Sequence, residues 1–142
     1  MNWIEVRSKK GASSYKSDMP WAAISIAVES NTWPVLRDNN RIGLLQLVFA
    51  DTCHSDVFQY QMFDTSHAIQ ILEFANTYWD KIDSLLIHCE DGNSLASAVA
   101  AALACIHSDI QSKDWYFNNK SPNLLVYNGI LMMHYDPDGL LR

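Results

Sequence analysis

The run Leu85-Leu86-Ile87-His88-Cys89 and the uncharged stretch at 93–106 constrain the fold more than any other part of the chain. The first is a short apolar run, which is typical of a buried strand. The second is apolar on nearly every helical face, as in a helix surrounded by other elements. Only Glu90, Asp91 and Gly92 separate the two. The sequence therefore predicts a buried strand, a short loop that opens after a cysteine, and a buried helix.

The rest of the chain alternates strand-like and helix-like segments without repeats. Strands are expected at 3–6, 21–28, 42–49 and 85–88, and helices at about 67–79, 94–107 and from Ser121-Pro122 to about 135, with Asp64-Thr65-Ser66 as N-cap residues of the first helix. This alternation predicts an α/β fold, in which helices flank a largely parallel central sheet on both faces. The length of 142 residues and the hydrophobic content of 49% predict one domain, 1–142.

Charge and composition exclude several classes of protein. The formal net charge of −6 argues against a nucleic-acid-binding surface. The basic residues Arg7, Lys9, Lys10 and Lys16 cluster near the N-terminus, where a solvated loop is expected. No apolar run approaches the roughly 20 residues of a membrane span, and the first residues lack the apolar core of a signal peptide. With only three cysteines, which fit a reducing compartment, we expect a cytoplasmic protein without membrane or nucleic-acid partners.

The predicted loop has the build of a phosphate cradle. Backbone N–H groups at a helix N-terminus point toward one spot, where the helix dipole favours an anion. The amides expected to form this cradle belong to Glu90, Asp91, Gly92, Asn93, Ser94 and Leu95. Ligands of parallel sheets bind at the carboxyl ends of the strands, and Cys89 is at such an end.

The sequence His88-Cys89-x-x-Gly92-x-Ser94 resembles the signature loop of cysteine-dependent protein phosphatases of the tyrosine and dual-specificity type. That loop reads His-Cys-x-x-Gly-x-x-Arg, followed by Ser or Thr. The order of elements is similar to that of the small bacterial and phage members. Weaker similarities extend the resemblance over roughly residues 20–130. The segment 21–26 looks like the family's early strand, 45–51 looks like the strand that leads into the loop of the general acid, 67–74 looks like the helix that follows, and 122–127 looks like the start of the last helix.

Two departures from the family's loop remove its chemistry. Leu95 stands at the arginine position, so Cys-x5-Leu replaces Cys-x5-Arg, and Ala96 stands at the hydroxyl position. A leucine supplies neither the charge nor the paired donors with which arginine holds a phosphate. A methyl group cannot donate a hydrogen bond to the leaving sulfur. The resemblance therefore implies that Cys89 occupies the nucleophile position but is idle.

The resemblance also implies a general acid and a loop histidine. Asp51 follows the 42–49 segment and matches the acid position, and Asp56 is the alternative. An equally open interpretation is that both are solvated loop carboxylates. His88 matches the histidine that orients the family's loop. Beside an idle thiol, we expect it to be a hydrogen-bonded core histidine.

Two other clusters suggest different chemistry. Asp51, Cys53, His54 and Asp56 are residue types that bind metals, but their spacing matches no closed zinc set, and no metal or cofactor is expected. The aromatic run Trp115-Tyr116-Phe117 could stack on a base or a phosphotyrosine ring. Packing of the last helix is the use that we favour.

These observations predict a pseudophosphatase, a phosphatase-like protein that binds a phosphorylated small molecule or protein without hydrolysing it. One alternative is a structural or interaction protein with a vestigial pocket. The other is a weakly active cysteine phosphatase, which requires a second cation in place of the missing arginine. Arg37, Arg41, Lys9 and Lys10 are the candidates for that cation.

Overall fold

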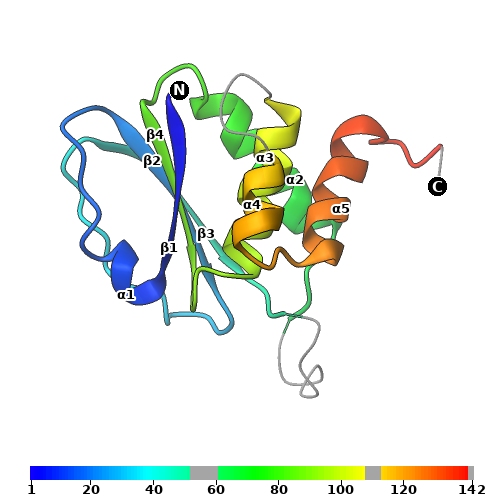
Figure 1. Ribbon diagram of the computed structural model, residues 1–142, viewed down its shortest axis with the longest axis horizontal. Coiled ribbons are helices and arrows are strands. Elements are labelled where there is room, and N and C mark those ends of the chain that lie inside the picture. Colours follow the sequence, from blue (N-terminus) through cyan, green and yellow to red (C-terminus); the bar gives the residue numbers. More distant parts are fainter. Residues whose placement is uncertain (52–60, 108–112, 141–142) are drawn as a thin grey trace.

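The computed structural model describes residues 1–51, 61–107 and 113–140 (Figure 1). The strands are β1 (Trp3–Ser8), β2 (Trp21–Ala27), β3 (Arg41–Val48) and β4 (Ser84–Cys89), and the helices are α1 (Lys9–Ala12), α2 (Thr65–Tyr78), α3 (Leu95–Ile106), α4 (Lys113–Asn119) and α5 (Leu124–Tyr135). The four strands form one parallel sheet in the order β1-β4-β2-β3. The predicted α/β fold with a parallel central sheet is confirmed.

Strand β4 lies in the interior of the sheet, between β1 and β2. All six of its residues are buried, because neighbouring strands cover both of its edges and other elements cover both of its faces. This position explains why β4 is a continuous apolar run rather than an alternating one. It also places Cys89, the last residue of β4, at the carboxyl end of the sheet beside Ser8 of β1.

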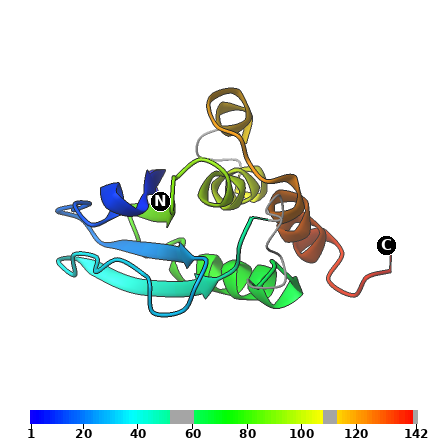
Figure 2. The ribbon, with the colours of Figure 1, turned by 90° about the horizontal axis from the view of Figure 1, so that it is seen from below.

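The two faces of the sheet are covered differently. One face packs against α2 and α3 in the main core, which includes Ile24, Ile87 and Val99. Helix α5 packs on α2 and α3, and α4 packs on α3. Trp21 and Leu86 belong to a smaller core on the opposite face. Figures 1 and 2 show all the long helices on one side and only the one-turn α1 on the other. Helices therefore flank the sheet on both faces, as expected, but on the second face the described helix is only the single turn α1.

Some helix boundaries differ from the prediction. Helix α5 begins at Leu124, and its N-cap is Asn123, whose side chain accepts a hydrogen bond from the Val126 amide at 3.1 Å. Pro122 therefore precedes the cap instead of occupying the first helical position. The N-cap of α2 is Asp64, as the sequence indicated, and a reciprocal bond from its amide to His67 Nδ1 completes a capping box.

Helices α1 and α4 were not predicted. Helix α4 contains the aromatic run, of which only Tyr116 is buried; Trp115 and Phe117 are exposed. Tyr116 joins the main core beside α3, and the Phe117 ring meets the Tyr127 ring edge-on, at 5.0 Å between centroids. The aromatic run therefore packs α4 on its neighbours. Within the described ranges, no helix is both long and apolar enough to span a membrane.

Candidate functional site

The loop between β4 and α3 closes tightly against the end of β1. Gly92 has a φ of +72°, in the left-handed region that side chains disfavour. A Cβ atom at this position would lie 2.7 Å from the carbonyl carbon of Arg7 and 2.7 Å from the nitrogen of Ser8. The Lys9 amide also donates to the Glu90 carbonyl at 3.1 Å. The loop therefore needs glycine for both its backbone conformation and its close contact with β1.

The Cys89 side chain is buried, and its sulfur lies at the N-terminus of α3. The Ala96 amide donates to the sulfur at 3.3 Å, and the thiol lies 3.6 Å from Asp91 Oδ1. Burial raises the pKa of Cys89; the amides of Ala96 and Gly92 partly oppose this, and the Asp91 carboxylate adds to it. The thiol is therefore protonated at neutral pH, which is unfavourable for a nucleophile.

Asp51 lies across the same cavity, just beyond β3. Its Oδ2 atom accepts a hydrogen bond from Ser94 Oγ at 2.6 Å, and its Oδ1 atom accepts one from Asn123 Nδ2 at 3.0 Å. Two residues that lie 43 and 72 positions away in the chain thus hold this carboxylate next to the loop. The alternative acid, Asp56, lies outside the described residues.

The cavity over the sulfur has a volume of about 100 Å³. Its lining residues are Ile26, Val28, Asp51, Cys89, Glu90, Asp91, Ser94 and Leu95. The charged residues in this set are three carboxylates, with no lysine or arginine among the described residues that line the cavity. Leu95 is 6% exposed and contributes part of the wall. The cavity therefore has the wrong charge for a phosphate dianion.

One of the amides predicted to form the cradle already has an acceptor within the loop. The Asn93 amide donates to Asp91 Oδ1 at 2.9 Å. The loop is also tied to α5, because the amides of Ser121 and Asn123 donate to the carbonyls of Asn93 and Ser94. These bonds hold the loop in shape, but they leave fewer donors for an anion.

None of the four candidate cations lines this cavity. Arg41 donates from one nitrogen to the carbonyls of Leu36 and Arg37, at 3.2 and 2.8 Å, beside a different cavity. Arg37 itself is exposed, and Lys9 and Lys10 belong to α1. None of these four residues therefore replaces the arginine that the signature loop lacks.

His88 is buried between β1 and β2. Its Nε2 atom lies 2.5 Å from Ser25 Oγ, whereas its Nδ1 atom has no hydrogen-bond partner in the described part of the chain. Burial lowers the pKa of His88 below its ordinary value. Because His88 does not line the cavity, its geometry fits the role of a core histidine that links β4 to β2.

The lowered pKa of His88 predicts a loss of stability in acid. The unfolded chain binds a proton on this histidine below about pH 6.5, while the folded protein still excludes it. Above that pH, His88 should therefore make no pH-dependent contribution to the free energy of unfolding. Below it, the free energy of unfolding should fall until the pH reaches the pKa of His88 in the folded protein. Urea unfolding of the parent protein and of His88→Gln at about pH 7.5 and about pH 5.5 measures the effect.

His134→Gln is the matched control, because His134 is exposed. The His88→Gln variant should lose part of the acid dependence, and the His134→Gln variant should keep that part. An acid dependence that is the same in the parent and in His88→Gln would contradict a lowered pKa for His88.

Sequence analysis identified Asp51 and His88 but missed their hydrogen-bond partners, Asn123 for Asp51 and Ser25 for His88. Asn123 carried a signal, since an asparagine directly before an apolar helix is a good N-cap. Ser25 carried none, because a serine in a strand gives no sign of which histidine it faces. Within the described residues, no group of three His, Cys, Asp or Glu side chains could hold a metal ion; Cys53 and His54 lie outside those residues.

Comparison with known proteins gives no family for this chain. No protein-family model matches the sequence, and no curated protein matches it.

Proposed function

We propose that this chain is a catalytically inactive phosphatase-like protein, a pseudophosphatase, that acts as an interaction protein with a vestigial pocket. The charge of the cavity over Cys89 carries this proposal. Asp51, Glu90 and Asp91 line that cavity, and Leu95 occupies the signature position of the phosphate-binding arginine. A phosphate brought over the sulfur would meet negative charge and no fixed cation.

The state of the thiol supports the same conclusion. A cysteine attacks a phosphoester as the thiolate, and burial together with Asp91 raises the pKa of Cys89. Loss of one charge-assisted donor to a transition state costs on the order of 10²–10³ in rate. A raised thiol pKa reduces the rate further, so turnover should be undetectable.

Phosphate binding without turnover, which the sequence predicts, is the second candidate function. The N-terminus of α3 supports it, because the Ala96 amide there is directed at the Cys89 sulfur, which lines the cavity. The three carboxylates oppose it. We therefore rank the interaction protein above the phosphate-binding module.

Hydrolysis of p-nitrophenyl phosphate by the purified protein and by Cys89→Ser tests the loss of turnover. Both proteins should hydrolyse the ester at the rate of a buffer blank. Turnover that Cys89→Ser abolishes would establish the weakly active phosphatase instead.

A thermal-unfolding titration with inorganic phosphate separates the two inactive alternatives. A ligand that binds only the folded protein raises its melting temperature as its concentration increases. We expect no shift beyond that of an equal ionic strength of sodium chloride. A phosphate-specific shift that Cys89→Ser leaves in place would favour the phosphate-binding module.

A further inference from the structure

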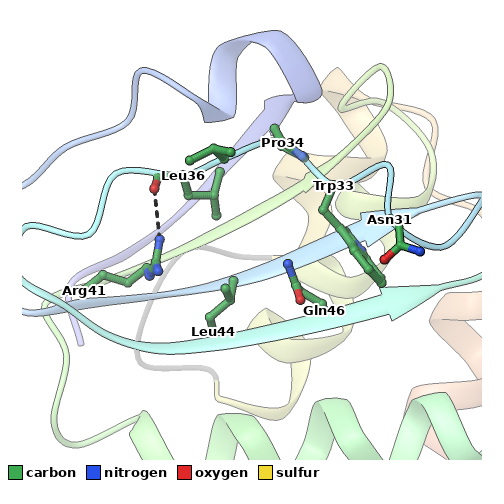
Figure 3. Close-up of a pocket in the computed structure, with 8 residues that line it drawn as sticks. Asn31, Trp33, Pro34, Leu36, Arg41, Leu44 and Gln46 are labelled. Atoms are coloured by element: carbon green, nitrogen blue, oxygen red, sulfur yellow. Dashed lines mark hydrogen bonds between the residues drawn. The ribbon is translucent and has the colours of Figure 1, made fainter.

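A second and larger cavity lies beside β3, on the face of the sheet opposite the long helices. Its volume is about 420 Å³, and its lining residues are Asn31, Trp33, Pro34, Val35, Leu36, Arg41, Leu44 and Gln46 (Figure 3). Leu44 and Gln46 form its floor on β3, and the segment 31–36 forms its wall. We call this cavity the β3 groove. It shares no lining residue with the cavity over Cys89.

The floor of the groove is the outermost strand of the sheet. The strand order ends at β3, so no described strand pairs with its outer edge along Leu44 and Gln46. Farther along, that edge is covered: the Val48 carbonyl lies 3.0 Å from His67 Nε2, and Ala50 forms a parallel bridge with Met62. The Phe49 amide donates to the Ala27 carbonyl, and alternate residues of a parallel strand bond to the same neighbour. The backbone N–H and C=O groups of Leu45 and Leu47 therefore point to β2, whereas those of Leu44 and Gln46 point to the open edge. These groups can pair with one added strand.

Arg41 supplies a positive charge at one end of the groove. One of its terminal nitrogens donates to two backbone carbonyls, which fixes the guanidinium in place. The groove lining contains no carboxylate, and the described residues form no ion pair with Arg41. A guanidinium has five N–H donors, so donors remain for a bound carboxylate. The local positive charge of Arg41 therefore favours a carboxylate at this end of the groove, although the net charge of the chain is −6.

The other end of the groove contains the Trp33 ring, with the polar side chains of Gln46 and Asn31 beside it (Figure 3). The Trp33 indole donates from Nε1 to the Leu47 carbonyl at 3.1 Å, which holds the ring upright over β3. Leu44, which is 39% exposed, lies between Trp33 and Arg41 (Figure 3). Val35 is 90% exposed beside them. A large apolar side chain between Trp33 and Leu44 would cover this surface.

We propose that the β3 groove binds an extended acidic peptide segment of a partner protein, which adds to the sheet as a strand beside β3. The peptide backbone pairs with Leu44 and Gln46, an apolar side chain packs against Trp33, and a carboxylate binds Arg41. Strands rise about 3.3 Å per residue, so the path from Arg41 to Gln46 spans roughly 16 Å, the length of about five peptide residues. Addition of a strand is a recurrent mode of peptide recognition.

Fluorescence anisotropy with a labelled peptide, Ser-Asp-Thr-Leu-Thr-Ile-Thr-amide, tests the proposal. Its alternation puts the aspartate, leucine and isoleucine on one face of a strand. We expect saturable binding that weakens about ten-fold or more in Arg41→Gln, because a charge-assisted pair is lost. Replacing the peptide's aspartate with asparagine should weaken binding to the parent protein equally. This comparison of two peptides uses only the parent protein, so it does not depend on how Arg41→Gln folds.

Lys81→Gln is the charge-matched control, since Lys81 is exposed and lies outside the groove. It should bind the peptide as the parent does. Cys89→Ser should also bind the peptide as the parent does, so that peptide binding at the groove can be tested independently of the proposed pseudophosphatase site. N-methylation of the peptide at the leucine or at the threonine that follows it should also weaken binding, because alternate N–H groups of a strand point to the same neighbour and one of these two must pair with β3.

Two results would overturn the proposal. One is binding that neither Arg41→Gln nor N-methylation changes, since the peptide would then bind elsewhere. The other is a dimer of the free protein, detected by light scattering, that Leu44→Lys dissociates. In that case a second copy of the chain, rather than an acidic peptide, covers the edge of β3.

Discussion

Replacing Gly92 with alanine should lower the free energy of unfolding by roughly 2–5 kcal/mol. The left-handed conformation of this residue costs a side chain about 1–2 kcal/mol, and overpacking adds about 1–3 kcal/mol. The overpacking follows from the position of the new Cβ atom, 2.7 Å from backbone atoms of Arg7 and Ser8. Backbone atoms at the end of a strand cannot move aside as a flexible side chain can. Urea denaturation of the two proteins measures the difference.

Gly11→Ala is the matched control. Gly11 lies in α1 with an ordinary φ, and its added Cβ would approach no atom closer than Ser8 Oγ at 3.4 Å. Because alanine favours a helix by about 1 kcal/mol over glycine, this variant should be as stable as the parent or slightly more stable. A Gly92→Ala protein as stable as Gly11→Ala would contradict the close contact between the loop and β1.

Introducing the arginine and serine of the phosphatase signature loop should strengthen phosphate binding at the cavity over Cys89. The variant carries Leu95→Arg and Ala96→Ser, together with Asp91→Ala so that the new arginine is not neutralised. Leu95 lines the cavity over Cys89, so a guanidinium at this position can reach the anion site. Each charge-assisted bond contributes about 1.5–3 kcal/mol, which corresponds to an affinity gain of about 10–100-fold. The measurement is thermal unfolding with and without phosphate or vanadate, followed by hydrolysis of an aryl phosphate.

The control variant keeps Asp91→Ala and Ala96→Ser but carries Leu95→Met, which conserves apolar volume without charge. It should gain no anion-dependent stability. If the arginine variant folds and also gains none, the loop does not have the geometry of a phosphate cradle. The resemblance to cysteine-dependent phosphatases would then have to be withdrawn for this site, while the β3 groove would be unaffected.

Elements with strong local signals were predicted well from the sequence. The strand expected at 85–88 is β4, Ser84–Cys89, and the helix expected at 94–107 is α3, Leu95–Ile106. Both were identified because unbroken apolar runs of those lengths can be buried in few other ways. Helix α1 has only four residues, Lys-Lys-Gly-Ala, and so has no periodicity from which it could be predicted. Helix α4 was read as an aromatic cluster, because its seven residues are too few to show a helical repeat.

The sequence by itself determined the strand–loop–helix unit and the absence of an arginine at position 95 and of a hydroxyl at position 96, since each depends on residues close together in the chain. It also determined the acidic charge of the chain, which is a sum over residues. Only the tertiary structure decided that Asp51, Ser94 and Asn123 bond to one another, that Asp91 faces the thiol, and that no basic residue in the described part of the chain replaces the arginine. It also decided that β3 is an edge strand with Arg41 and Trp33 beside it. The physical reason is that strand order and packing bring distant residues together, and no local pattern records which strand lies at the edge.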